Sequence, residues 1–240
     1  MAEDLSNQHP EDLFNLTIDD LQRVVVEEFG QPAFRAVQTF EWVYSQGVTA
    51  FSEMTNLPPA LRKSLEGRFY FPEARVADRQ ISSDGTRKYL LEVDQGQLVE
   101  SVMIKQPTRM TLCVSSQVGC GMGCAFCRTA TMGFRRHLST SEIIRQVRAV
   151  IKDAKNFGDS FSNIVFMGMG EPLHNFKGIT GAIKILTHQK AFSIAPRRIT
   201  VSTVGLVPAI QKFGESDLKV NLAVSLNATT DEVRQAIMPV

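Results

Sequence analysis

The sequence has no long apolar run and almost no net charge, and each absence removes a class of protein. No stretch approaches the roughly 18 apolar residues that a membrane-spanning helix needs. The 240 residues include 26 Lys and Arg against 25 Asp and Glu, so net charge alone favours no particular partner. The N-terminus is acidic and lacks the apolar core of a signal peptide. We therefore expect a cytoplasmic protein that does not associate with membranes.

Cysteine is also scarce, with four residues in the chain, yet three of them fall close together. Cys120, Cys124 and Cys127 have the spacing C-x3-C-x2-C, with glycines between them. In a reducing compartment such clustered cysteines more often bind metal than form disulfides. Three thiolates leave one corner of a 4Fe–4S cluster open to a small molecule, whereas structural zinc sites use four protein ligands. The loop predicts a cluster, with a zinc site completed by Cys113 or a histidine, and chance burial, as weaker alternatives.

Helical and strand patterns divide the chain into three parts. Residues 1–75 contain three helical patterns, of which the first begins at Thr17, as an N-cap, and the second ends at Gly47, and these predict a small helical domain. Residues 76–108 alternate apolar and polar positions in two runs, 87–93 and 98–104, which predicts a β-hairpin linker. Residues 109–240 form the third part.

Short strands alternate with helices in this third part. "TLCVSS", "NIVFMG", "RITVST" and "VNLAVS" are β-rich, and helical patterns begin near Thr140, Phe176 and Val207. Such alternation predicts βαβ units around a parallel sheet, whose functional residues gather at the carboxyl ends of the strands. The segments at these ends are the cysteine loop and residues 168–172, 202–205 and 225–227.

Several of these segments together resemble one family. "LCVSSQVGCGMGCAFCRTATMGFRR", "NIVFMGMGEPL", "RRITVSTVG" and "VNLAVSLNA" resemble the RlmN/Cfr-type radical S-adenosylmethionine (SAM) RNA adenine methyltransferases. "FRAVQTFEWVYSQGVTAFSEMTNLPPALR" is similar to the N-terminal helical domain of that family. The resemblance implies an α/β fold: a partial (β/α)6 radical SAM barrel, with about four of the six strands present, after a helical domain and a β-hairpin.

The resemblance also implies roles for individual residues. Cys120, Cys124 and Cys127 match the ligands of the 4Fe–4S cluster. Glu100 matches the proton acceptor of the family, and Cys113 matches the cysteine that resolves the covalent RNA intermediate. The positions that match SAM contacts are Gly170, Glu171, Ser202, Ser225, Leu226 and Asn227. At the last of these, Asn227, the family usually has a histidine.

The chemistry implied by the resemblance is methylation of an adenine in 23S rRNA, with transfer RNA as a candidate second substrate. In the family one SAM methylates a cysteine near the C-terminus, and a second is cleaved to a radical that activates this methyl group. The activated carbon adds to C2 (RlmN type) or C8 (Cfr type) of the adenine, and the cysteine loop looks closer to the C2 enzymes. The cysteine matched by Cys113 then forms a transient disulfide. A flavodoxin-like electron donor and a monomeric state are further expectations.

The family sequence continues beyond the position of Val240, and all four cysteines already match other roles. We therefore expect this chain to be the front part of such an enzyme, without the methyl-carrying cysteine. Two other classes stay open. A radical SAM enzyme for a small molecule or peptide would not need the helical domain, and a non-catalytic cluster-binding or zinc-binding protein would not need the SAM motifs.

Basic residues are concentrated after the cysteines and offer contacts for RNA phosphates. Between residues 128 and 155 seven basic side chains stand against two acidic ones. A solvated helix face explains Arg145 and Arg148 equally well. The other candidates for phosphate contacts are Arg128, Arg135, Arg136, Arg197 and Arg198.

Overall fold

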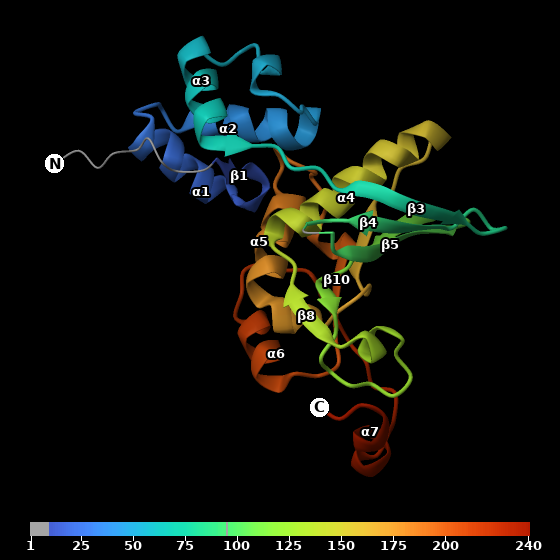
Figure 1. Ribbon diagram of the computed structural model, residues 1–240. Helices are drawn as coiled ribbons and strands as arrows, with labels where there is room; N and C mark the ends of the chain where they lie inside the picture. The colour runs from blue at the N-terminus through green and yellow to red at the C-terminus, as the bar shows by residue number, and fades with distance from the viewer. Residues whose placement is uncertain (1–9, 95) are drawn as a thin grey trace. The chain divides into compact units, whose positions relative to one another are not determined.

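The computed structural model describes residues 10–94 and 96–240 (Figure 1). The described residues divide into two compact units, one of residues 10–72 with 185–193 and the other of residues from 73 to 184 with 194–240. No helix among the described residues has the length and apolar character to cross a membrane.

The first unit is mainly helical. Its helices are α1 (Ile18–Arg23), α2 (Phe34–Glu41) and α3 (Pro59–Arg68), and a short parallel pair, β1 (Glu11–Asp12) with β2 (Phe69–Tyr70), accompanies them. Thr17 caps α1 as predicted, because its side chain and Asp20 exchange hydrogen bonds in a capping box. Gly47, with φ of 73°, ends the helical run that continues from α2.

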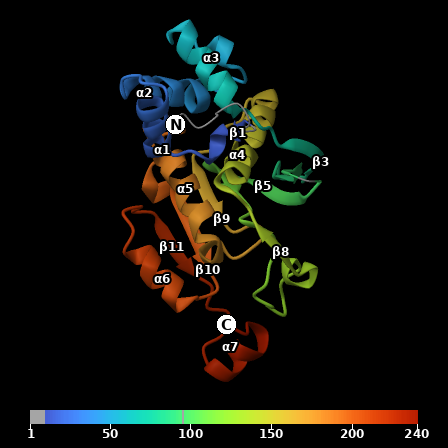
Figure 2. The same ribbon diagram turned by 60° about the vertical axis from the view of Figure 1, so that its left-hand side comes forward.

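The second unit is built on one sheet that joins parallel and antiparallel strands. Within the described residues its strands, in spatial order, are β11 (Asn221–Val224), β10 (Ile199–Thr203), β9 (Asn163–Phe166), β6 (Arg109–Cys113), β5 (Leu98–Gln106), β4 (Arg87–Glu92) and β3 (Arg75–Ile81). The first four are parallel, and they are the four strands predicted from the sequence. Figure 2 shows β9, β10 and β11 side by side.

The remaining three strands form an antiparallel meander on the β6 side of the sheet. The two runs expected to form a hairpin are β4 and β5, and β5 pairs directly with β6. Strand β3 was not predicted, because all seven of its residues are exposed and its sequence lacks an alternating apolar pattern. The meander therefore shares a sheet with the parallel strands.

Helices follow the parallel strands, and those near Thr140, Phe176 and Val207 were predicted from the sequence. They are α4 (Thr140–Ala154), α5 (Phe176–Thr187), α6 (Val207–Gly214) and, near the C-terminus, α7 (Asp231–Ile237). A capping box at Ser139, with Glu142 as its partner, starts α4. The alternation of strand and helix creates parallel neighbours by way of helical crossovers.

The sheet has one covered face and one more open face. Buried residues of the covered face come from every strand between β4 and β10: Tyr89, Leu91, Ser101, Met103, Leu112, Ile164, Phe166, Ile199 and Val201. Helix α4 packs on this side, where Gln146 accepts from the Ser101 hydroxyl at 2.9 Å and Asp153 accepts from the Tyr89 hydroxyl at 3.0 Å. Alternate residues point to the other face, which is only half-buried.

This difference between faces predicts unequal effects of two adjacent substitutions in β9. Ile164 is fully buried on the covered face, so Ile164→Ala should lower the free energy of unfolding by about 2–4 kcal/mol. Val165 points to the open face, so Val165→Ala should cost less than about 1.5 kcal/mol. Urea unfolding of both variants measures the two costs. Equal losses would contradict the assignment of the faces.

Candidate active site at the carboxyl ends of the parallel strands

The segments that follow β6 and β9 are joined by a ladder of hydrogen bonds. The N–H of Gly168 donates to the Val114 carbonyl at 3.1 Å, and the N–H of Ser116 donates to the Met169 carbonyl at 2.8 Å. The Ser115 hydroxyl accepts from the Met169 N–H at 2.9 Å. A Cβ at Gly168 would stand 2.8 Å from the Val114 carbonyl oxygen, so only glycine allows this approach. We call residues 114–117 and 168–171, joined in this way, the β6–β9 junction.

The cysteine loop begins directly after the junction and is closed by a small ribbon. Strand β7 (Gln117–Gly119) enters the loop and β8 (Phe134–His137) leaves it, and the two pair antiparallel. Gly119 has φ of 74°, and a Cβ there would lie 1.7 Å from the Gly133 carbonyl oxygen. The ribbon therefore brings the two ends of the loop together, and glycine at position 119 is required for it.

The three predicted cluster ligands lie on this loop with free thiols. Cys120 and Cys124 are buried, and Cys127 is partly exposed. Burial raises the pKa of Cys120 and Cys124, and the neighbouring Cys127 and Glu171 raise it further. The thiols are therefore close enough to one another, and to Glu171, to interact electrostatically.

Three free thiols on one loop are a donor set that could hold three of the irons of a 4Fe–4S cluster. In residues 10–94 and 96–240, no three His, Cys, Asp or Glu side chains converge on a point where one metal ion could bind. In a 4Fe–4S cluster each cysteine binds a different iron, so the thiols surround the group instead of meeting at one point. Binding iron would also remove the thiol protons that burial now favours.

Glu171 lies at the end of β9 and connects it to the end of β10. The side chain is 2% exposed. One carboxylate oxygen accepts from the Leu173 N–H at 3.0 Å, and the other accepts from the Val204 N–H at 2.9 Å. Burial raises the pKa of the carboxyl, while these hydrogen bonds act in the opposite direction. A carboxylate has about four acceptor positions, so these bonds leave capacity for a ligand ammonium group.

Gly170 is required for a reason that the sequence did not reveal. The family resemblance implies only that Gly170 contacts SAM. In the structure its φ is 103°, and a Cβ would lie 2.5 Å from the Cβ of Gln117 and 2.7 Å from the hydroxyl of Ser116. Close packing inside the β6–β9 junction is thus sufficient to exclude any larger residue.

The other predicted SAM contacts lie at the ends of β10 and β11. The Ser202 hydroxyl donates to the Phe166 carbonyl at 2.9 Å, and the Ser225 N–H donates to the Thr203 carbonyl at 2.9 Å. Leu226 and Asn227 are exposed. Asn227 has φ of 56°, in the left-handed region that Asn adopts more readily than most residues.

Glu100 and Cys113 project from the open face of the sheet. Val102 pairs directly with Cys113, and Glu100 precedes Val102 by two residues, so all three side chains share this face. The Glu100 carboxylate forms an ion pair with Lys88 at 3.2 Å, and both side chains are half exposed. Burial raises the pKa of Cys113 to about 11, although a hydrogen bond from the Met167 backbone opposes the shift.

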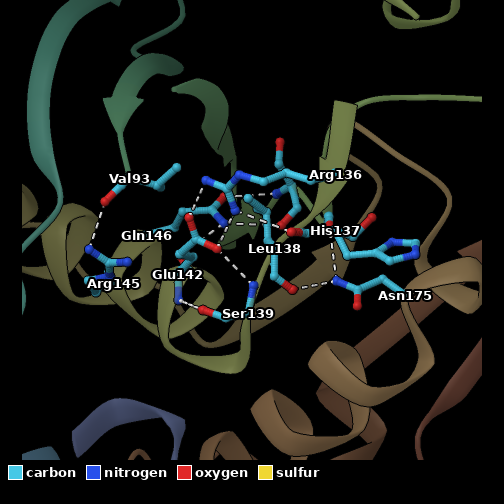
Figure 3. Close-up of polar contacts among 11 residues, drawn as sticks. Val93, Arg136, His137, Leu138, Ser139, Glu142, Arg145, Gln146 and Asn175 are labelled. Atoms are coloured by element: carbon cyan, nitrogen blue, oxygen red, sulfur yellow. Dashed lines mark hydrogen bonds and ion pairs between the residues drawn. The ribbon is translucent and has the colours of Figure 1, made fainter. Parts of the chain in front are cut away.

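Some of the candidate arginines for RNA binding form contacts within the protein, and others are exposed. Both expectations for Arg145, a solvated helix face and a phosphate contact, were wrong. Arg145 is 6% exposed, and it donates to the Val93 carbonyl at 2.7 Å, so it lies neither on a solvated helix face nor in reach of phosphates (Figure 3). Arg136 forms a bidentate ion pair with Glu142, with hydrogen bonds of 2.8 and 2.7 Å. The arginines that remain exposed are Arg128, Arg135, Arg197 and Arg198.

Sequence reasoning missed the buried amides that support the β6–β9 junction. Gln146, from α4, accepts from the Ser115 N–H at 2.9 Å and donates to the Ser115 carbonyl at 3.1 Å. Asn175 donates to the carbonyls of Ser116 and Leu138 at 2.8 and 2.7 Å. Gln117 is fully buried and bonds to the Glu171 N–H. The available signal was the polar run "SSQ" directly after an apolar strand.

Comparison with known proteins agrees with this geometry. Residues 114–240 match the radical SAM superfamily, and residues 11–70 match the ribosomal RNA large subunit methyltransferase N-terminal domain. A crystal structure of a radical SAM methyltransferase from Sphaerobacter thermophilus superposes with a TM-score of 0.85 at 39% identity, and covers 96% of this chain and 67% of that one. The chain therefore belongs to the radical SAM superfamily, as the motifs implied.

Curated relatives carry the same name across several bacteria. The dual-specificity RNA methyltransferase RlmN of Geobacter sulfurreducens is 48% identical over 229 residues, which are 95% of this chain and 62% of that protein. RlmN 2 of Myxococcus xanthus is also 48% identical, over 236 residues, with 62% of that protein covered. The chain thus spans less than two thirds of the length of these relatives. The expected partial radical SAM barrel is confirmed, and the cofactors of the superfamily are a 4Fe–4S cluster and SAM.

The raised pKa of Cys113 predicts slow alkylation at neutral pH. The thiolate is the reactive form, so the rate with iodoacetamide should rise about tenfold per pH unit between pH 7 and about pH 10. Mass spectrometry of the cluster-free protein measures this rate, and in urea the pH dependence should shift toward that of an ordinary thiol. Alkylation of Cys113 at pH 7 as fast as that of the partly exposed Cys127 would contradict the prediction.

Proposed function

We propose that this chain is the cluster-binding and SAM-binding portion of an RNA methyltransferase that methylates C2 of an adenine in 23S rRNA. An adenine of transfer RNA is the second proposed substrate, in keeping with the dual specificity in the names of its relatives. The observation that carries the proposal is the β6–β9 junction, which places the three-cysteine loop beside the Gly170 and Glu171 turn. The RlmN-type N-terminal domain favours RNA over a small molecule or peptide.

The cofactor site is assigned to residues at the ends of the four parallel strands. Cys120, Cys124 and Cys127 would hold the cluster. When bound, the cluster supplies the electron that splits SAM. Glu171 would accept hydrogen bonds from the SAM ammonium, and this positive charge would keep the buried carboxylate ionised against the effect of burial. The rest of SAM would be oriented by contacts from Gly170, Ser202, Ser225, Leu226 and Asn227.

Glu100 and Cys113 are assigned to proton transfer and to release of the product. Lys88 forms an ion pair with the Glu100 carboxylate, and a carboxylate at this position would serve as the proton acceptor. Cys113 is held as a neutral thiol by burial, so it is protected from unwanted oxidation until a later step exposes it or removes its proton. Both side chains share the open face with Ser202. Cys113 pairs with Val165, and Val165 pairs with Thr200, so these three residues point to the same face. Ser202 follows Thr200 by two residues and therefore points to this face too.

Substrate docking is assigned to the exposed arginines and to the helical N-terminal unit. Arg128, Arg135, Arg197 and Arg198 can neutralise phosphates, which makes binding dependent on salt. We further propose that the protein works in the cytoplasm as a monomer and receives electrons from a flavodoxin-like donor. The external donor is required because no redox group other than the cluster is part of the proposed site.

A chimera tests the proposed reaction. This chain, placed in the G. sulfurreducens protein in exchange for its matching 229-residue segment, should form 2-methyladenosine in 23S rRNA under anaerobic, reducing conditions. Glu100→Gln should lower the rate at least roughly 100-fold, the range of a lost general base, without loss of iron or of SAM binding. Glu215→Gln, on an exposed position after α6, is the matched control and should leave the rate unchanged.

Mass spectrometry of digested RNA reads the outcome. Cys124→Ala should abolish the product together with the cluster. An intact cluster and SAM cleavage with 8-methyladenosine as the product would overturn the C2 assignment, and modification of a small molecule in place of RNA would overturn the substrate class.

A further inference from the structure

One buried side chain connects the cysteine loop with both ends of the Glu171 turn. Gln117 is the first residue of β7, three positions before Cys120, and it is 0% exposed. Its side-chain oxygen accepts from the Glu171 N–H at 2.8 Å. Its side-chain nitrogen lies 3.0 Å from Nδ1 of His137 and 3.2 Å from Nδ1 of His174.

These contacts determine which way the amide faces. The Glu171 N–H is a donor, so the group that it meets must be the amide oxygen of Gln117. The NH2 group then faces the two imidazoles and has a hydrogen for each of them. Each Nδ1 can therefore serve as the acceptor, in the tautomer that has its hydrogen on Nε2.

The two imidazoles lie on different segments. His174 belongs to the 3-10 helix Pro172–Asn175, and its own N–H donates to the Glu171 carbonyl at 3.2 Å. His137 is the last residue of β8, and it pairs with Gln117 in the ribbon that closes the cysteine loop. The rings of His137 and His174 contact each other at a centroid distance of 4.8 Å, and Phe134 contacts both. One amide thus holds the turn at residues 171 and 174 and attaches it to both sides of the ribbon.

Steric packing adds to the hydrogen bonds. The Gln117 side chain packs against Gly170 at the place where a larger residue would have its Cβ. A Cβ at position 170 would lie 2.5 Å from the Gln117 Cβ. The position of Gly170 and Glu171 is thereby set from the cysteine loop by contact as well as by hydrogen bonding. Neither Gln117 nor the two histidines is among the residues assigned to bind the cofactors.

We propose that Gln117 is a positioning residue for SAM binding, with His137 and His174 as its anchors. Its amide holds the Gly170 and Glu171 turn in fixed register with the three cysteines, so both halves of the cofactor site form one preorganised surface. The proposal rests on the assignment of Gly170 and Glu171 to SAM in the proposed function. Loss of the amide frees the turn without removing any ligand of the cluster or any contact to SAM.

Substitutions that keep or remove single hydrogen bonds test this role. Gln117→Leu should weaken SAM binding by roughly tenfold or more at unchanged iron and sulfide content, the effect of about one lost buried hydrogen bond. His174→Leu should also weaken binding. His174→Asn should bind SAM within about threefold of the native protein, because the Asn oxygen can accept where Nδ1 does.

A loss of one buried hydrogen bond elsewhere serves as the control. Tyr89→Phe removes the bond to Asp153 on the covered face, away from the β6–β9 junction, and it should lower the melting temperature while SAM affinity stays unchanged. Native-like SAM affinity in both Gln117→Leu and His174→Leu would overturn the proposal, and so would equal loss in His174→Asn and His174→Leu.

Hydrogen exchange in the cluster-free protein separates this inference from the proposed function. The Glu171 amide should exchange at least about tenfold faster in Gln117→Leu than in the native chain, with amides of β4 and β5 unchanged. This measurement needs no cofactor. If the native protein with a full cluster fails to bind SAM, the proposed function fails, and the exchange result still decides whether Gln117 holds the turn. Unchanged exchange at Glu171 would contradict the inference whatever the SAM result.

Discussion

The backbone contact between the ends of β6 and β9 is the constraint on which the rest of the site depends. Adjacent parallel strands end at the same edge of a sheet, and here the two outgoing segments continue to bond after the strands have ended. Two glycines, Gly168 and Gly170, are needed because any Cβ would meet the opposing segment at less than 3 Å. Main-chain geometry therefore brings a three-cysteine loop and a buried carboxylate together, and the Gln117 side chain adds a further connection between them.

The two faces of the sheet have different roles: the covered face stabilises the fold, and the open face carries the candidate catalytic side chains. On the covered face, apolar side chains and α4 supply the burial that stabilises the fold. On the open face, Glu100, Cys113 and Ser202 come from three different strands and point to the same side. Antiparallel strand β5 is as much a part of this surface as the parallel strands, because it pairs directly with β6. The meander therefore contributes a candidate catalytic residue to a sheet that is otherwise typical of βαβ folds.

Local patterns in the sequence were sufficient for much of this structure. β-rich runs predicted β6, β9, β10 and β11, and helical spacing predicted the starts of α4, α5 and α6, because both signals lie within each segment. The cysteine spacing predicted the loop for the same reason. Strand β3 was missed because an exposed strand has no apolar alternation to reveal it.

Features that depend on distant partners were not predictable in this way. Arg145 is buried because the meander places the Val93 carbonyl 52 residues away in sequence against α4. The role of Gln117 depends on Glu171 and His174, which are 54 and 57 residues away. In both cases a polar residue was buried by its partner, and no local pattern shows where that partner lies.

The central claim is that the cysteine loop and the Gly170 and Glu171 turn form a single cofactor site. Electron paramagnetic resonance of the reduced 4Fe–4S cluster tests it most directly, with and without SAM, in anaerobically reconstituted protein. The account predicts that SAM changes the spectrum of the native cluster, because a cluster held by three cysteines would leave one iron free to bind SAM. An identical spectrum in the presence and absence of saturating SAM, at full iron and sulfide content, would contradict it.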